Sequence, residues 1–289
     1  MKNFSTFALF FLALALLPAA EVTRYHVMAS PKYPSRGDKV NIQFRNDVNT
    51  YVMSFTNMPA NTKQDPGTDI GMTQPHHYFN FPGAGFMNLS VNGISSRYLI
   101  PKEIKLNDKN GTATADVLFN FDGTRIILRF EMIDKNPLLF LTLIHDPASK
   151  PVKNMELNIQ AYPSINQGNA KKSEYQREIV TKGKIYKVDN GVKWLQLDHD
   201  STVLDLIDRA QQPPNNPKSQ GPCAVLADWK GIKSGKAFLG KSYKVLLRFN
   251  LKPDAGKWRF AFFEQKKQTS NDDYFILRKK NHELFAFPE

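Results

Sequence analysis

The sequence predicts an all-β protein: a large antiparallel β-sandwich, similar to a supersandwich, with one short helix. Three observations predict this fold. Apolar and polar residues alternate with a period of two along most of the chain, and Asn-Gly or Asp-Gly pairs separate several of these runs. Predicted strands and helices do not alternate along the sequence, which argues against a Rossmann or barrel fold. The 289 residues are enough for one sandwich with a sizeable core.

The N-terminal residues 1–20 have the layout of a secretory signal peptide. Lys2 supplies the basic start, Phe7–Leu17 is an apolar run, and Pro18-Ala19-Ala20 precedes the expected cleavage site. A membrane-spanning helix needs about 20 apolar residues, so this run is too short for an anchor. We therefore expect a secreted or periplasmic protein with no transmembrane segment after signal cleavage. Residues 21–289 are expected to form a single sandwich domain, with a possible sub-boundary near residues 166–170.

The firmest structural prediction is a hairpin over Thr112–Ile133. Its two apolar faces flank Asp122-Gly123, a pair that tolerates the positive φ of a two-residue turn. With this turn, Phe119 lies opposite Ile126. The other cross-strand pairs on this face, farther from the turn, are also apolar. Turn and face pattern thus predict the same register.

The remaining elements follow from the same alternation. Asn92-Gly93 and Asn190-Gly191 each predict a further hairpin turn. One segment, Thr202–Gln211, has helical spacing of its apolar residues and a preceding cap, and it is the predicted helix. The further predicted strands are Met87–Val91, Ile94–Leu99, Leu138–Ile144 (central), Met155–Ala161, Lys184–Asp189, Val192–Leu197, Lys244–Leu251, Trp258–Phe263 and Leu284–Phe287.

Charge is distributed unevenly along the chain. Residues 21–150 carry 14 basic and 12 acidic side chains, whereas residues 151–289 carry 24 and 15. Outside the cytoplasm, a basic surface favours anionic polymers such as acidic polysaccharides, although a well-solvated basic surface is the alternative. Export argues against nucleic acid as a partner. The single cysteine, Cys223, is expected to be a buried apolar residue, and no cofactor or metal is predicted.

The segment from Pro75 to Phe86 contains the densest group of candidate binding residues. His76, His77, Tyr78 and Asn80 combine imidazoles, an aromatic ring and an amide within five positions. Aromatic rings stack on sugars, and His and Asn hydrogen-bond hydroxyl groups, so these residues are predicted to bind carbohydrate. A buried aromatic strand is the alternative.

Pro75–Gly83 resembles the Asn-His-x-Tyr-Phe-Asn-Leu-x-Gly segment of the galactose mutarotase (aldose 1-epimerase) family. The resemblance covers nine residues, with Pro75 in place of Asn and Phe81 in place of Leu. It implies a β-supersandwich fold, and it implies that His76 occupies the position of the family's catalytic general acid. The family's downstream catalytic Glu has no counterpart in a matching sequence context here.

Other residues offer further possibilities. Trp229 lies in a loop-like context and is the best exposed stacking candidate, whereas Trp194 and Trp258 are expected in the core. Asp198-His199-Asp200 could contribute metal ligands, but a helix cap and a strand end explain it better. Glu131 and Glu156 could form an acid–base pair only if they faced one cleft.

Three functional hypotheses follow. The first is an exported sandwich that recognises a carbohydrate, with acidic glycans among the candidates. The second is an enzyme on the same fold, similar to an epimerase, a lyase or a hydrolase. The third is a structural module that interacts with the envelope and binds no small ligand. The sequence leaves the oligomeric state open.

Overall fold

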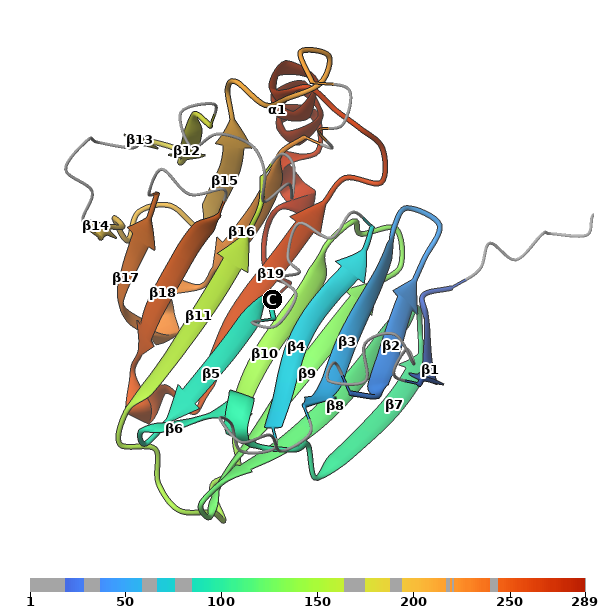
Figure 1. Ribbon diagram of the computed structural model, residues 1–289, viewed down its shortest axis with the longest axis vertical. Helices are drawn as coiled ribbons and strands as arrows, with labels where there is room; N and C mark the ends of the chain where they lie inside the picture. The colour runs from blue at the N-terminus through green and yellow to red at the C-terminus, as the bar shows by residue number, and fades with distance from the viewer. Residues whose placement is uncertain are drawn as a thin grey trace, which may run out of the picture.

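The computed structural model describes residues 19–28, 37–58, 67–75, 85–163, 175–187, 194–216, 219, 221–239 and 244–288. In these residues, two large antiparallel sheets pack face to face, which confirms the predicted all-β sandwich (Figure 1). The predicted signal peptide, apart from Ala19 and Ala20, and the stretch 166–170 lie outside the described residues. Within the described residues, no helix is long and apolar enough to span a membrane.

The front sheet in Figure 1 has ten strands and runs from the N-terminal strands to a C-terminal group. Strand β6 (Ile94–Ser95) pairs with β5 beside the main order. In spatial order the others are β1 (Glu21–Val27), β2 (Lys39–Arg45), β3 (Thr50–Met58), β4 (Gly67–Gln74), β5 (Met87–Val91), β11 (Met155–Ala161), β18 (Val245–Leu251), β17 (Ile232–Phe238) and β14 (Leu195–Gln196).

The second sheet has nine strands and lies behind the first in this view. Its spatial order is β13 (Ile185–Lys187), β12 (Arg177–Val180), β15 (Val203–Asp208), β16 (Cys223–Ala227), β19 (Lys257–Glu264), β10 (Leu139–His145), β9 (Thr124–Ile133), β8 (Thr112–Phe121) and β7 (Glu103–Lys109). Short 3₁₀ turns occur at η2 (Ser96–Tyr98), η4 (Trp229–Gly231), η5 (Pro253–Ala255) and η6 (His282–Leu284).

The predicted hairpin between β8 and β9 is confirmed in its register. Phe119 pairs with Ile126 and Ala113 with Met132, while Asp122 and Gly123 both take positive φ at the turn. The hairpin turn between β5 and β6 is also confirmed, with Val91 opposite Ile94 across the Asn-Gly turn. The strand predicted over Ile94–Leu99 is wrong beyond Ser95, where η2 begins. β10 is central, because it lies between β9 and β19.

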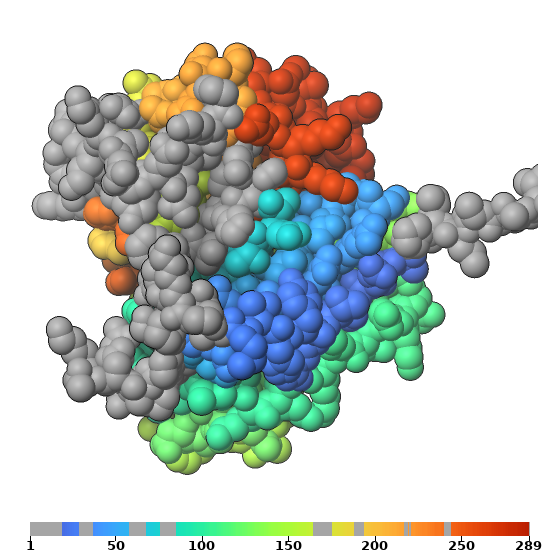
Figure 2. All heavy atoms as spheres, turned by 45° about the vertical axis from the view of Figure 1, so that its right-hand side comes forward, coloured from blue at the N-terminus to red at the C-terminus, as the bar shows by residue number. Residues whose placement is uncertain are grey.

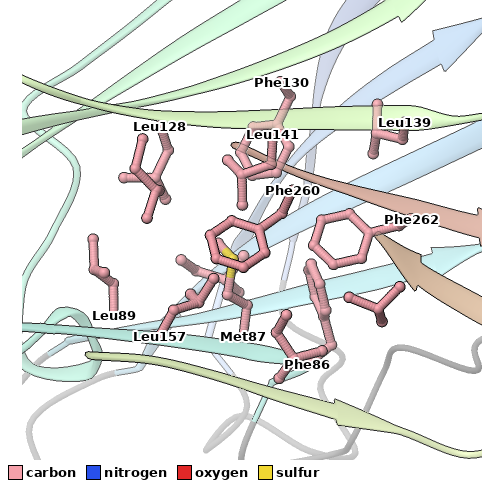
Figure 3. Close-up of a cluster of buried hydrophobic side chains, with 14 of the residues drawn as sticks. Phe86, Met87, Leu89, Leu128, Phe130, Leu139, Leu141, Leu157, Phe260 and Phe262 are labelled. Atoms are coloured by element: carbon pink, nitrogen blue, oxygen red, sulfur yellow. The ribbon is translucent and has the colours of Figure 1, made fainter. Parts of the chain in front are cut away.

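The core fills the space between the two sheets. Phe86, Met87, Leu89 and Leu157 from the ten-stranded sheet face Leu128, Phe130, Leu139, Leu141, Phe260 and Phe262 from the nine-stranded sheet (Figure 3). These side chains come from both halves of the sequence. The alternation read from the sequence therefore identifies which side of each strand lies in the core.

The predicted helix over Thr202–Gln211 is wrong, because these residues contain strand β15. Leu204 and Leu206 point into the core, whereas Asp205 and Ile207 point to the other side, where they are also buried. A strand buried on both faces has apolar residues at almost every position, which also satisfies helical spacing.

The helix observed is instead α1 (Asn271–Lys280). Ser270 caps it by accepting a hydrogen bond from the backbone N–H of Asp273, and acidic residues in its first turn and basic ones in its last complement the helix dipole. The predicted strand Leu284–Phe287 is also wrong, because Leu284 belongs to η6. In Figure 2 this C-terminal segment (red) lies at one end of the molecule, and the green segment of β7–β9 lies at the other.

The hairpin predicted around Asn190-Gly191 does not form between the described strands. β13 pairs with β12 in the nine-stranded sheet, whereas β14 pairs with β17 in the ten-stranded sheet. The turn residues themselves lie outside the described residues. The two short strands separate because Tyr186 pairs with Ile179 on one sheet while Leu195 pairs with Ala237 on the other.

Candidate functional site

The predicted binding residues His76, His77, Tyr78 and Asn80 lie outside the described residues. The structure describes the strands on either side of them, β4 and β5, which are neighbours in the ten-stranded sheet. The segment therefore connects two adjacent strands of that sheet. The surface beside this connection is the place to look for a site.

The end of this segment is held to the sheet by Gly85 and Phe86. The Phe86 N–H donates to the Ile70 carbonyl at 2.7 Å, and the Phe86 carbonyl accepts from the Gln160 N–H at 2.7 Å. Gly85 has φ +61°, and a Cβ there would lie 2.5 Å from the Ile70 oxygen. Only glycine fits this close approach. The Phe86 ring packs edge-on against Phe262 in the core, with centroids 5.2 Å apart.

Polar side chains gather on the outer face of the same sheet, across β5, β11, β18 and β17. Alternate residues of β11 and β18 are buried in the core, so the residues between them point outward. Cross-strand pairing aligns Asn88 with Asn158 and Asn158 with Arg248. We call this group the polar field; its members are Asn88, Glu156, Asn158, Arg248 and Asn250.

The side chains of the polar field hold one another in place. Arg248 Nε donates to Asn158 Oδ1 at 3.0 Å and lies 3.5 Å from Glu156 Oε1, and Asn158 Nδ2 donates to Glu156 Oε1 at 2.8 Å. Asn88 Oδ1 accepts from two serine hydroxyls, those of Ser95 and Ser96, at 2.7 and 3.1 Å. The side chains of Arg248 and Glu156 remain 41% and 32% exposed, so they can still contact a ligand.

An aromatic side chain borders the polar field. The Arg248 guanidinium lies over the Trp194 ring at 4.6 Å from its centroid, and Phe238 lies on the same border, with its ring centroid 5.8 Å from that of Trp194. Trp194 is half-buried, so the expectation that it lies in the core is wrong. Trp258 is buried, as predicted.

Two further side chains connect the polar field to the anchored end of the His76 segment. Gln160 Nε2 donates to the Gly85 carbonyl, and Lys244 Nζ donates to Gln160 Oε1, each at 3.4 Å. Gln160 follows Asn158 on the same outward face of β11. Gln160 therefore links the outer face that carries the polar field to the buried Gly85.

Trp229 lies elsewhere. It belongs to η4, and its ring packs against the inward-facing Gly235 and Phe249, while its Nε1 donates to the Ser201 carbonyl at 2.9 Å. His199 stacks on this indole with ring centroids 4.6 Å apart. Trp229 is thus half-buried at the side of the sandwich, and the structure does not bring it to the polar field.

The remaining acidic and histidine candidates are separated in space. Asp198 accepts from Lys184 Nζ at 3.1 Å, while His199 turns to Trp229, so the Asp198-His199-Asp200 run does not converge on a point. Among the described residues, no group of three His, Cys, Asp or Glu side chains could hold a metal ion. Glu131 lies on β9 and Glu156 on β11, on the outer faces of opposite sheets, so they cannot act as a pair.

Cys223 is fully buried, as expected, and burial raises the pKa of its thiol well above the usual value. A thiol held in this neutral form is a poor nucleophile. The structure therefore agrees with its role as a small packing residue.

Sequence reasoning missed Arg248, Asn158 and Trp194 as a group. Each outward position on β11 and β18 could be recognised from the alternation alone. Their meeting depends on the pairing of β11 with β18, strands about ninety positions apart in the chain. No local signal encodes that pairing.

Comparison with known proteins gives no family. No protein-family model and no curated protein sequence matches the chain. Among solved structures, a TPR-domain containing protein from Parabacteroides distasonis is similar over 84% of this chain and 53% of its own, with 8% identity and a TM-score of 0.45. The galactosidase domain of the α-galactosidase-sucrose kinase AgaSK is similar over 84% and 42%, with 9% identity and a TM-score of 0.43.

A GH36 α-galactosidase, AgaA from Geobacillus stearothermophilus, is similar over 78% of this chain and 41% of its own, at 8% identity and a TM-score of 0.40. The chain thus spans about half or less of the length of these proteins. At such TM-scores the likeness carries no information about function.

Proposed function

We propose that this protein recognises a carbohydrate on the polar field, with the His76–Phe86 segment along one side of the binding surface. The observation that carries the proposal is the arrangement of Asn88, Asn158 and Arg248 in one row across three paired strands. Rigid strands position such groups more accurately than loops do.

The chemistry of the polar field suits sugar hydroxyl groups. Amide groups both donate and accept hydrogen bonds in the plane of their bonds, and carboxylates accept them, as adjacent hydroxyls on a pyranose ring require. Arg248 supplies several N–H donors and is held by Asn158 and Glu156, so little side-chain entropy is lost when a ligand binds. Trp194 provides an apolar border of the kind that packs against sugar carbons.

Recognition is proposed rather than catalysis. The pair of carboxylates suggested by the sequence, Glu131 and Glu156, faces opposite directions. The resemblance to galactose mutarotase supplies a histidine at position 76 but no matching catalytic Glu. Export, as predicted from residues 1–20, would expose the protein to envelope or extracellular glycans.

A glycan array read at low and at moderate salt tests this proposal. We expect saturable binding of at least one glycan, weakened about tenfold by Asn158→Ala and by Arg248→Gln, because each removes hydrogen bonds worth roughly 1.4 kcal/mol. Asn107→Ala is the matched control, since Asn107 is an exposed asparagine on β7 of the other sheet.

The outcomes separate the parts of the proposal. Absence of glycan binding at both salt concentrations would exclude the function. Binding that is equally strong in wild type, Asn158→Ala and Arg248→Gln would place the site elsewhere. Binding that is unchanged in His76→Ala would remove the His76 segment from the site while leaving the polar field in it.

A further inference from the structure

A row of charged side chains crosses the outer face of the other, nine-stranded sheet. Thr142 on the central strand β10 pairs with Arg129 on β9 and with Arg259 on β19. Arg129 in turn pairs with Asp116 on β8, and the backbone of Asp228 bonds to that of Arg259. We call these five residues the charged row, which reads Asp116, Arg129, Thr142, Arg259, Asp228 across the sheet.

Each arginine of the charged row is oriented by the aspartate on its far side. Arg129 donates from Nε and Nη2 to the two carboxylate oxygens of Asp116, both at 2.7 Å. Arg259 donates from Nε to Asp228 Oδ2 at 2.9 Å, and its Nη2 lies 2.8 Å from the same oxygen. The hydrogen bond to Asp116 raises the pKa of Arg129, so this group is always charged. Because an aspartate already holds each guanidinium group, the two arginine side chains lose little conformational entropy when they bind an anion.

The space between the two arginines is a groove of about 610 Å³ with Thr142 and Ile144 in its floor. Its lining holds four basic side chains, including Lys230 and Lys257, against two acidic ones. Glu131 is one of these acids. Burial raises its pKa, while the charge of Arg129 opposes that rise. The groove therefore keeps a positive surplus.

The spacing fits one oxyanion between the arginines. Arg129 and Arg259 flank a single strand, so their Cα atoms are separated by two interstrand distances, roughly 10 Å. Each guanidinium is held toward the aspartate on its far side, and Arg259 Nη1 also donates to the Pro288 carbonyl at 2.8 Å, so the groove above Thr142 stays open between the two side chains. The Nε–Nη2 edge of Arg129 faces Asp116, so its Nη1 end can donate into this gap.

We propose that this groove binds the oxyanion of an acidic polysaccharide, a uronate carboxylate or a sulfate ester, between Arg129 and Arg259 above Thr142. Both sources present the same negatively charged oxygens to the remaining N–H groups of the two arginines and to Lys230 and Lys257 in the lining. The proposal does not rest on the carbohydrate site of the polar field, because the groove lies on the opposite face of the sandwich. Three of the four basic residues in the groove, Lys230, Lys257 and Arg259, belong to the basic part of the chain, residues 151–289. The proposal therefore assigns part of that basic excess to ligand binding.

Isothermal titration with two probes tests the proposal: a κ-carrageenan tetrasaccharide, which carries sulfate esters and no uronate, and a tetragalacturonate, which carries carboxylates and no sulfate. We expect at least one of them to bind, with the affinity falling as salt rises. Arg129→Gln and Arg259→Gln should each weaken that binding about tenfold, the loss of one charge-assisted hydrogen bond. The stronger of the two probes identifies the source of the oxyanion.

Arg125→Gln is the matched control. Arg125 lies on the same face of β9 and also pairs with an aspartate, with its Nη2 2.6 Å from Asp146 Oδ2, but it does not line the groove. Thr142→Tyr provides a second variant, because it fills the groove and leaves both arginine–aspartate pairs intact. If either arginine variant fails to fold, the loss of binding in Thr142→Tyr still tests whether the groove is the site.

The proposal is overturned if neither probe binds, if Arg125→Gln weakens binding as much as Arg129→Gln, or if Thr142→Tyr binds as well as wild type. Binding lost in Arg248→Gln but kept in Arg129→Gln would also overturn it, because the acidic glycan would then belong to the polar field. Loss of probe binding in the groove variants alone supports the proposal, whether or not the polar field binds a glycan.

Discussion

The two outer faces of this sandwich share one core but differ in their chemistry. The ten-stranded sheet carries a network of amides, a carboxylate and one arginine, bordered by Trp194. The nine-stranded sheet carries arginine–aspartate pairs on β8, β9 and β19, and an apolar area beside them. The same alternation of inward and outward positions thus produces two different surfaces.

The C-terminal segment accounts for part of this difference. Phe140, Ala224, Leu226, Ala261 and Phe263 point outward from β10, β16 and β19, yet all are buried together with Tyr274 of α1 and with Phe285. Where the C-terminal segment packs on them, these three strands are apolar on both faces, because α1 and Phe285 cover their outer side. The apolar side chains beside the polar field, Trp194 and Phe238, are instead only half-buried.

The largest expected effect on stability comes from the packing of α1 on the outer face of the nine-stranded sheet. Tyr274 is fully buried, packs on Phe263 and donates its hydroxyl to Asp205. Tyr274→Ala should destabilise the protein by about 3–5 kcal/mol, as is usual when a buried aromatic side chain is removed. Trp194→Ala, on the other face, should cost about 1 kcal/mol, because this indole is only half-buried. Urea denaturation of both variants checks the contrast, and equal losses would contradict it.

A second effect on the covered face depends on pH. Burial raises the pKa of Asp205 from 3.8 to about 6, although Arg278 and the Tyr274 hydroxyl oppose the rise. Between these values the folded protein holds a proton that the unfolded chain has released. The contribution of Asp205 to stability is therefore full below about pH 4 and is lost as the pH rises through 6, by up to about 3 kcal/mol.

Comparison with Asp205→Asn isolates this contribution. The free energy of unfolding of wild type minus that of the variant should fall between pH 4 and pH 7, because all other titrating groups cancel in the difference. A difference that stays constant or rises over this range would contradict the proposed origin of the shift.

Gly85→Ala acts on the uncovered face. Its Cβ would meet the Ile70 carbonyl at 2.5 Å, and alanine is disfavoured at φ +61°. We expect a loss of about 2 kcal/mol together with weaker glycan binding, since Gly85 fixes the end of the His76 segment beside Gln160. Gly256→Ala is the control, as its φ is +67° but nothing lies within 4 Å of its Cβ. Equal stability losses in Gly85→Ala and Gly256→Ala would show that the close contact of Gly85 with the Ile70 carbonyl does not contribute to stability.

Much of this fold could be predicted from the sequence because the signals are local. The β8–β9 hairpin depends on a two-residue turn and on alternation within 22 residues, and its register is correct. The sequence of β15 predicts a helix because α1, about 70 residues later, buries the second face of this strand. Burial on both faces is a property of the tertiary structure, so the period of two disappears from the sequence of β15.

The sites show the same division. Asn158 and Arg248 are recognisable individually as outward residues, but their contact requires the pairing of β11 with β18. The charged row joins residues from β8 to β19, separated by more than 140 positions. The residues chosen from sequence were those close together in the chain, such as the His76 segment. Both sheet-face sites could be seen only after the strands were assembled.

The smallest expected effect compares one carboxylate from each face. Asp116 receives two 2.7 Å hydrogen bonds from Arg129, whereas Glu156 receives one at 2.8 Å from Asn158 and lies 3.5 Å from Arg248. Bidentate pairs are stronger than single contacts, and half-exposed pairs contribute little. Asp116→Asn should therefore cost about 1 kcal/mol, and Glu156→Gln less than about 0.5 kcal/mol. Denaturation at low and high salt measures both, and a larger loss in Glu156→Gln would mean that the polar field contributes to stability rather than being kept for a ligand.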